Sequence, residues 1–216
     1  MSYGELISSY IIAETMKSRG IYAERKNAQE LVVTDSNFTK ANVIYKETNA
    51  NIKSYFKSAN QDITIVPGFV SNSNLGEVTT LGRGGSDFTA AIIAAALKVK
   101  SLEIWTDVSG IFTANPKLVK HAYPIKQLSY QEAMELSHFG AKVLYPPTVQ
   151  PALDLNIPIQ IKNTLKPDEV GTVISSEKEV STKSPVKGIT NINDIALLTL
   201  QGNGMVGIPG FSKRLF

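Results

Sequence analysis

The chain has 216 residues, of which 43% are hydrophobic and 19% charged, and its formal net charge is +3. This is an ordinary globular composition, with enough residues for one sizeable domain and the start of a second. The absence of cysteine excludes disulfides, thiolate metal sites and cysteine nucleophiles, and fits the cytoplasmic location that we expect. No basic run indicates a nucleic-acid surface, and no apolar stretch approaches the roughly 20 residues of a membrane span.

Hydrophobic periodicity divides the chain into helices and strands. In chain order it predicts helix 6–16, strand 30–34, helix 45–59, a buried strand running into a turn over 63–70, strand 78–81, helix 86–98, strand 101–107, helix 129–139, helix 147–155 and strand 159–162. Ser129 and Glu132 have the spacing of a capping box, which supports a helix start at that point. Strands interleaved with helices predict an α/β fold with a largely parallel sheet.

The C-terminal part of the chain has a different character. Residues 176–185 are polar and end in proline, so we expect a linker there. Residues 186–200 have a strand-like pattern, which predicts that a second domain begins within 186–216. Residues 202–207 match G-x-G-x-x-G, but the match stands alone without the acidic residue expected about 20 positions later, so we reject a dinucleotide site.

The segment GRGGSD, residues 82–87, precedes the most apolar predicted helix. Glycines allow a sharp turn and close approach of a ligand, and the N-terminus of a helix favours an anion. Arg83 adds a fork that matches a carboxylate, and Asp87 is an acceptor suited to an ammonium group. These features describe a pocket for an amino acid, although by pattern alone a glycine turn in which Ser86 caps the helix is the simpler interpretation.

Three other positions carry polar groups near the ends of predicted elements. Thr106 and Asp107 end a strand, and ligands of open parallel sheets lie beyond the carboxyl ends of strands. Lys142 follows a helix, where a lysine can neutralise phosphate charge. Glu5 lies at the start of the first helix. By pattern alone, each position has a simpler interpretation. Thr106 and Asp107 would lead into a turn after a strand, Lys142 would be a solvated surface lysine, and Glu5 would be a charge that favours the helix dipole.

In order and spacing, several motifs together resemble those of the aspartokinases, members of the amino-acid-kinase superfamily. The resemblance covers nearly the whole chain. The motifs that carry it are YGELIS at 3–8, LGRGGSDFTAA at 81–91, EIWTDVSGIFTANP at 103–116, LSYQEAMELSHFGAKVLYP at 128–146 and IPIQIKNT at 157–164.

The resemblance implies a three-layer α/β/α kinase domain over residues 1–175 that transfers the γ-phosphoryl group of ATP to the β-carboxylate of L-aspartate. It implies that Glu5 helps to hold the substrate ammonium group and that Arg83 grips a substrate carboxylate. The implied remainder of the substrate pocket is Gly84, Gly85, Ser86 and Asp87, with Asp87 as the catalytic residue. The implied nucleotide contacts are Thr106, Asp107, Phe112, Lys117, Lys142 and Val143. We expect Mg²⁺ to be carried by the ATP phosphates, without a protein metal site.

The sequence departs from the family pattern at four positions, where tyrosine, aspartate, arginine and histidine are usual. These positions are Phe112, Asn115, Lys117 and Tyr145. The family's Lys-Phe-Gly-Gly phosphate loop does not occur in the 216 residues. We expect that loop upstream of Met1, and we therefore expect this chain alone to be poorly active.

The resemblance also implies partners. Residues 186–216 resemble the beginning of an ACT regulatory domain, which binds an end-product amino acid such as lysine or threonine, and the ending is similar to enzymes fused to a homoserine dehydrogenase. We expect a homo-oligomer with neither nucleic-acid nor membrane partners. Two alternatives remain: a non-catalytic regulatory or ligand-sensing fragment of the same enzyme, and a sister kinase acting on acetylglutamate or carbamate.

Overall fold

The structure, a computed structural model, describes residues 3–138, 143–176, 186–192 and 196. Its helices are α1 (Tyr3–Ser18), α2 (Tyr45–Ser58), α3 (Gly85–Leu97), α4 (Tyr130–His138) and α5 (Pro146–Asp154), with a 3-10 turn η1 (Ala28–Glu30). Its strands are β1 (Ala23–Arg25), β2 (Val33–Thr34), β3 (Ile63–Ile65), β4 (Val70–Ser73), β5 (Val78–Thr80), β6 (Leu102–Thr106), β7 (Gln127–Ser129), β8 (Ile159–Asn163) and β9 (Thr172–Ser175). Within the described ranges, no helix is both long and apolar enough to cross a bilayer.

The strands form three sheets, with the orders β1-β3, β2-β4-β5 and β6-β8-β9-β7. Four pairings are parallel, namely β1 with β3, β2 with β4, β6 with β8 and β7 with β9. Two are antiparallel, β4 with β5 and β8 with β9. The predicted α/β class with mostly parallel pairing is therefore confirmed.

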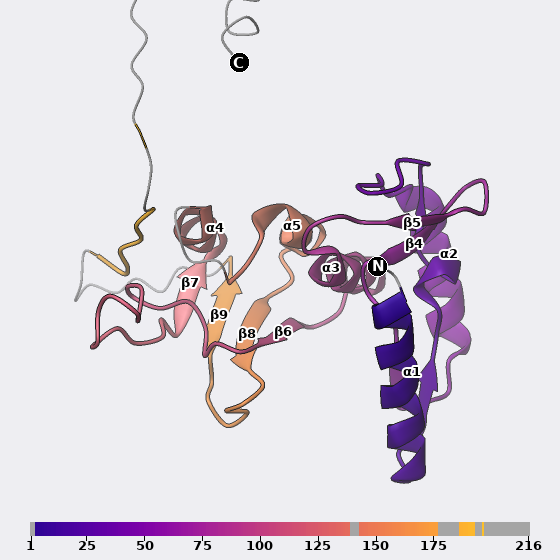
Figure 1. The fold of residues 1–216 in the computed structure, drawn as a ribbon, viewed down its shortest axis with the longest axis horizontal. Helices are drawn as coiled ribbons and strands as arrows, with labels where there is room; N and C mark the ends of the chain where they lie inside the picture. The colour runs from indigo at the N-terminus through magenta and orange to yellow at the C-terminus, as the bar shows by residue number, and fades with distance from the viewer. Residues whose placement is uncertain (1–2, 139–142, 177–185, 193–195, 197–216) are drawn as a thin grey trace, which may run out of the picture.

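The four-stranded sheet carries α3, α4 and α5 on one face (Figure 1). The alternation of β6 and β8 explains this arrangement, because Ile104 lies opposite Ile161 and both side chains are buried under the helices. The next pair along, Trp105 and Lys162, points to the other face, where the ammonium group lies 4.4 Å from the indole centroid. The sheet therefore has one apolar and one partly exposed polar face.

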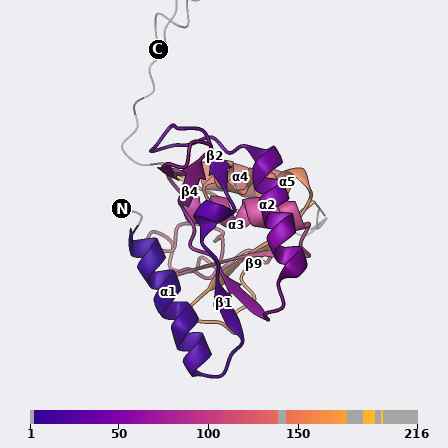
Figure 2. The same cartoon turned by 90° about the vertical axis from the view of Figure 1, so that its right-hand side faces the viewer.

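Helix α3 is shared between two apolar clusters. Ala91 and Ala94 pack with the four-stranded sheet, whereas Ile92 and Ala96 pack with Ile52 of α2. Figure 1 shows α3 between α5 and α2, and in Figure 2, where the molecule is seen from the α2 side, α2 lies in front of α3. A helix that is buried on two sides needs apolar residues nearly all round, which explains the run of Ala and Ile. Its small side chains permit close packing, so the start of α3 is held firmly by its neighbours.

The five helices lie within three residues of their predicted positions at every described end, and the Ser129–Glu132 capping box is present. The strand and turn predicted over 63–70 are both present, with β3 ending at Ile65 and the chain turning at Phe69, whose φ is 70°. The strand β4, which begins at Val70, was not predicted. Of the predicted strand 30–34, only Val33–Thr34 is a strand, and η1 includes Glu30.

The sequence analysis missed β1, β7 and β9, which have three or four residues each. Residues 186–192 contain no strand, contrary to the strand-like pattern of 186–200. The rest of that range lies largely outside the described residues, as do Gly140 and most of the predicted linker, so the domain boundaries stay predictions.

Candidate active site

The GRGGSD segment forms a tight loop that opens α3. Gly82 and Gly84 have φ values of 75° and 68°, a left-handed conformation that other residues adopt only with strain. The N–H of Gly85 donates to the Gly82 carbonyl at 3.1 Å, which closes the turn. A Cβ on Gly84 would lie 2.8 Å from Cγ2 of Thr148. Both the backbone conformation and the contact with α5 therefore require glycine at position 84.

Arg83 projects from this loop and is exposed. Its guanidinium carbon lies 5.1 Å from the ring centroid of Tyr145, the residue before α5. Such a cation–π contact supports the guanidinium group while leaving its N–H groups available to a ligand. Tyr145, at a position where histidine is usual, therefore places a phenol ring beside the predicted carboxylate grip, and the sequence alone did not predict this contact.

The first turn of α3 carries Ser86 and Asp87. Burial raises the pKa of the Asp87 carboxyl above its usual value. Ser86 lines a cavity of about 410 Å³ between β3, α3 and β6, together with Thr64 and Leu102. Ser86 is exposed at this cavity, whereas Asp87 is half-buried, and their common substrate pocket stays a prediction.

The strand ends form a second group of polar residues. Thr106 ends β6, and its hydroxyl donates to the carboxylate of Asp107 at 3.1 Å. Asn163 ends β8, and its side-chain N–H donates to the Ser109 hydroxyl at 2.9 Å in a buried contact. Because β6 and β8 are parallel and Thr106 pairs with Asn163, the carboxyl ends of these two strands lie side by side. The Ser109 hydroxyl in turn helps to hold the pKa of Glu169 below its usual value.

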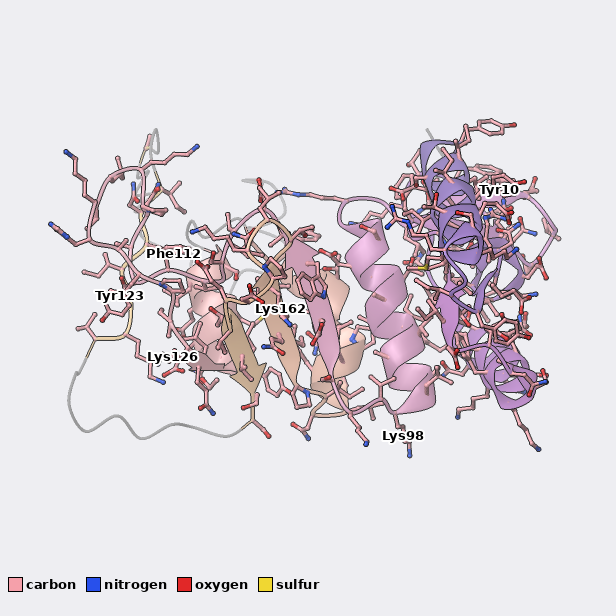
Figure 3. The ribbon with its side chains drawn as sticks, turned by 90° about the horizontal axis from the view of Figure 1, so that it is seen from below. Tyr10, Lys98, Phe112, Tyr123, Lys126 and Lys162 are labelled. Carbon is pink, nitrogen blue, oxygen red and sulfur yellow. The ribbon has the colours of Figure 1, made fainter. Side chains whose placement is uncertain are left out.

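Residues 111–125, here called the arm, cross from β6 at one edge of the four-stranded sheet to β7 at the other. The two ends of the arm pair with each other: Phe112 bridges to Pro124, and the Thr113 N–H donates to the Tyr123 carbonyl at 2.9 Å. Figure 3 shows Phe112 and Tyr123 together beyond the sheet. Lys117, near the tip, is exposed. The arm is therefore a projection that is fixed at its base.

Thr172 of β9 fastens the base of the arm. Its hydroxyl accepts a hydrogen bond from the Ile111 N–H at 2.9 Å and donates one to the Ile125 carbonyl at 2.6 Å. The neighbouring Gly110 has a φ of 121°, and a Cβ there would lie 2.3 Å from the Thr172 hydroxyl oxygen. Sequence reasoning missed these residues, because their partners lie about 50 to 60 positions away and produce no local pattern.

The glycine loop and the strand ends lie toward the same end of the molecule. Helix α3 runs back along the sheet to Lys98, and the chain then turns into β6, as Figure 3 shows. The beginning of α3 and the end of β6 are therefore on the same side, and the structure brings residues 82–87 and Thr106 to one end of the fold.

The remaining predicted positions are less well connected to this group. Glu5 is half-buried in the first turn of α1, which packs on β1 and β3, and its approach to Arg83 stays a prediction. Val143 is half-buried and packs on the core beneath the helices. Lys142 lies outside the described residues. In the described ranges, no three acidic or histidine side chains gather as a metal site would require.

Three comparisons bear on this arrangement. A bifunctional aspartokinase/homoserine dehydrogenase 1 of Arabidopsis thaliana, a chloroplastic protein, is 36% identical over 221 residues, which cover 100% of this chain and 24% of that protein. The crystal structure of Escherichia coli aspartokinase III with aspartate and ADP is 34% identical, with a TM-score of 0.77, and covers 83% of this chain and 40% of that one. The same enzyme with lysine and aspartate has a TM-score of 0.77 and 35% identity, with the same coverage.

The chain thus spans about a quarter of the length of that curated relative. The predicted resemblance to aspartokinases is confirmed by these similarities. A family signature described as "Amino acid kinase family" matches residues 1–163, which include the glycine loop, the arm and both strand ends. This protein therefore belongs to the amino acid kinase family.

Proposed function

We propose that this chain forms the substrate-facing part of an aspartate kinase, which transfers the γ-phosphoryl group of ATP to the β-carboxylate of L-aspartate. The product would be 4-phospho-L-aspartate, the first intermediate of the pathway to lysine, threonine and methionine. Support comes from the similar protein named aspartokinase III, whose structure contains aspartate and ADP.

The observation that carries the proposal is the loop at the start of α3. Left-handed glycines at positions 82 and 84 turn the backbone sharply, and α3 contributes the positive end of its dipole. Arg83 stands at this mouth with an exposed guanidinium group. This arrangement suits a small dicarboxylic amino acid, with one carboxylate gripped by Arg83 and the other left free to react.

The reaction that we propose needs positioning and charge neutralisation more than it needs a covalent catalyst. The β-carboxylate of aspartate is ionised at neutral pH, so it requires no general base. Asp87, close to the loop, would orient the substrate through its ammonium group. Thr106 and the arm with Lys117 would face the nucleotide, with Mg²⁺ bound chiefly by the phosphates.

The proposal extends to regulation and assembly. Residues 186–216 would begin an ACT-like domain that takes an end-product amino acid, either lysine or threonine. The similar aspartokinase III structure that contains lysine supports an amino-acid effector. We also propose a homo-oligomer, as expected from the sequence.

Calorimetric titration of aspartate into the purified chain measures the aspartate affinity and so tests the proposal without depending on turnover. We expect Arg83→Ala to weaken aspartate binding about 10- to 100-fold, the range for a lost charge-assisted contact. Arg83→Lys should lie between the two, because lysine keeps the charge but not the fork. Arg19→Ala, at an exposed arginine at the end of α1, is the matched control and should bind aspartate as the wild type does.

Two results would refute the function. The first is equal aspartate affinity in the wild type, Arg83→Ala and Arg19→Ala. The second is tighter binding of acetylglutamate or carbamate than of aspartate, which would move the assignment to a sister kinase. A longer form of the polypeptide that binds aspartate and ADP but never transfers phosphate would instead identify a ligand-sensing protein.

A further inference from the structure

Residues 186–189, here called the strap, lie beside the arm (Figure 1). The N–H of Ile189 donates to the Thr113 carbonyl at 2.8 Å, so the strap adds a third segment to the paired base of the arm. A Cβ on Gly188 would lie 3.4 Å from the same carbonyl oxygen. The strap therefore contacts the backbone of the arm directly, at the point where its exposed part begins.

The strap also contacts α4. The Lys187 ammonium group donates to a carboxylate oxygen of Glu132 at 3.1 Å, with the two side chains 25% and 38% exposed. A Cβ on Gly188 would lie 3.3 Å from side-chain carbons of both Leu136 and Ile125. The strap therefore lies in contact with both the arm and α4. Their side chains leave little room for a residue larger than glycine at position 188.

The Glu132 carboxylate holds two groups at once. The same oxygen that Lys187 contacts accepts the Ser129 N–H at 2.8 Å and so caps the start of α4. Burial alone would raise the pKa of Glu132, but the hydrogen bonds from Ser129 and Lys187 outweigh it and hold the pKa below its usual value. The contact between the strap and α4 thus involves an ionised carboxylate, one oxygen of which accepts both hydrogen bonds.

We propose that the strap positions the arm for nucleotide binding, with Lys187 as a positioning residue that acts through Glu132. The inference rests on the proposed function, which assigns Phe112 and Lys117 of the arm to the nucleotide. Thr172 fastens one side of the base of the arm, and the strap fastens another. An arm that has lost one attachment samples more conformations, and ordering it again weakens nucleotide binding.

Aspartate binding should be insensitive to the strap. The loop at 82–87 is held by α3, α5 and the turn at Phe69, none of which contributes the contacts described for the strap. The strap is also the first part of residues 186–216, which are predicted to begin a regulatory domain. A ligand that displaces the strap would therefore be expected to change nucleotide affinity first.

Two matched pairs of variants of the 216-residue chain test this inference. Ile189→Pro removes the N–H that Thr113 accepts, whereas Ile189→Ala keeps it. Lys187→Met removes the charge at similar length, whereas Lys187→Arg keeps it. The measurements are hydrogen exchange of residues 111–125 without ligand, ADP affinity and aspartate affinity.

We expect Ile189→Pro and Lys187→Met to speed exchange in the arm and to weaken ADP binding about three- to tenfold. Aspartate affinity should stay within about twofold of the wild type. General destabilisation of the fold would weaken binding of both ligands, so a change in ADP affinity alone points to the arm. Ile189→Ala and Lys187→Arg should behave as the wild type. If Ile189→Pro does not fold, the lysine pair gives the same test.

Unchanged exchange in the arm of Lys187→Met would overturn the positioning role, whatever happens to ADP. Faster exchange with unchanged ADP affinity would overturn the coupling to nucleotide binding. A wild-type chain that binds no ADP would overturn the proposed function and this coupling together, and the ligand-free exchange data would still show separately whether the strap holds the arm.

Discussion

Replacing Thr172 with valine tests whether its hydroxyl fastens the base of the arm. Valine has nearly the same shape, and Thr172 is fully buried, so the substitution removes only the two hydrogen bonds to Ile111 and Ile125. Each buried backbone group left without a partner costs about 1 to 3 kcal/mol. With two such groups, we therefore expect Thr172→Val to lower the free energy of unfolding by about 2 to 6 kcal/mol.

Thr172→Ser is the matched control, because it keeps the hydroxyl and loses only a methyl group, at a cost of about 1 kcal/mol. Urea unfolding followed by circular dichroism measures both variants. In thermal melts, Thr172→Val should unfold about 4 to 24 °C below the wild type, at about 2 to 4 °C per kcal/mol for a domain of this size. If Thr172→Ser is destabilised as much as Thr172→Val, packing of the methyl group matters more than the hydroxyl, and the reasoning is wrong.

Three further predictions concern the loop and α4. Gly84→Ala should cost about 1 to 3 kcal/mol in urea unfolding, because of its left-handed φ and the contact with Thr148, and a fully stable variant would contradict this. The folded-state pKa of Asp87 is raised, so the free energy of unfolding should fall as pH rises above the unfolded pKa near 3.8. Asp87→Asn should remove that pH-dependent loss of stability and should also weaken aspartate binding. The folded-state pKa of Glu132 is lowered, so Glu132→Gln should cost at most about 1 kcal/mol at pH 7. This difference should shrink as pH falls below the unfolded pKa near 4.5 and vanish once pH has passed through the lower folded-state pKa; a pH-independent difference would argue against the ionised cap.

The sequence predicted the helices well because each has a long periodic pattern or a capping signal. The glycine loop was also placed correctly, since its turn needs glycine for reasons that are local to residues 82–85. Strands such as β7 were missed because three residues are too few to show alternation.

The network around the strand ends could not be predicted in the same way. Asn163 and Ser109 are 54 positions apart, and only the parallel pairing of β6 and β8 brings them together. The contact of Arg83 with Tyr145 depends likewise on how α5 packs against α3. Asn163 does lie within the motif at 157–164, so its position at the end of a strand was the one available indication.

The shared carboxylate of Glu132 has a consequence for local opening of the protein. When Lys187 leaves, Glu132 loses its counter-ion, and when the first turn of α4 frays, Lys187 loses its acceptor. Release of residues 186–189 should thus ease fraying of that turn, and the reverse, by up to the roughly 1 kcal/mol of a partly exposed ion pair. The amides of Ser129 and Ile189, in different parts of the chain, would then both exchange faster in Lys187→Met.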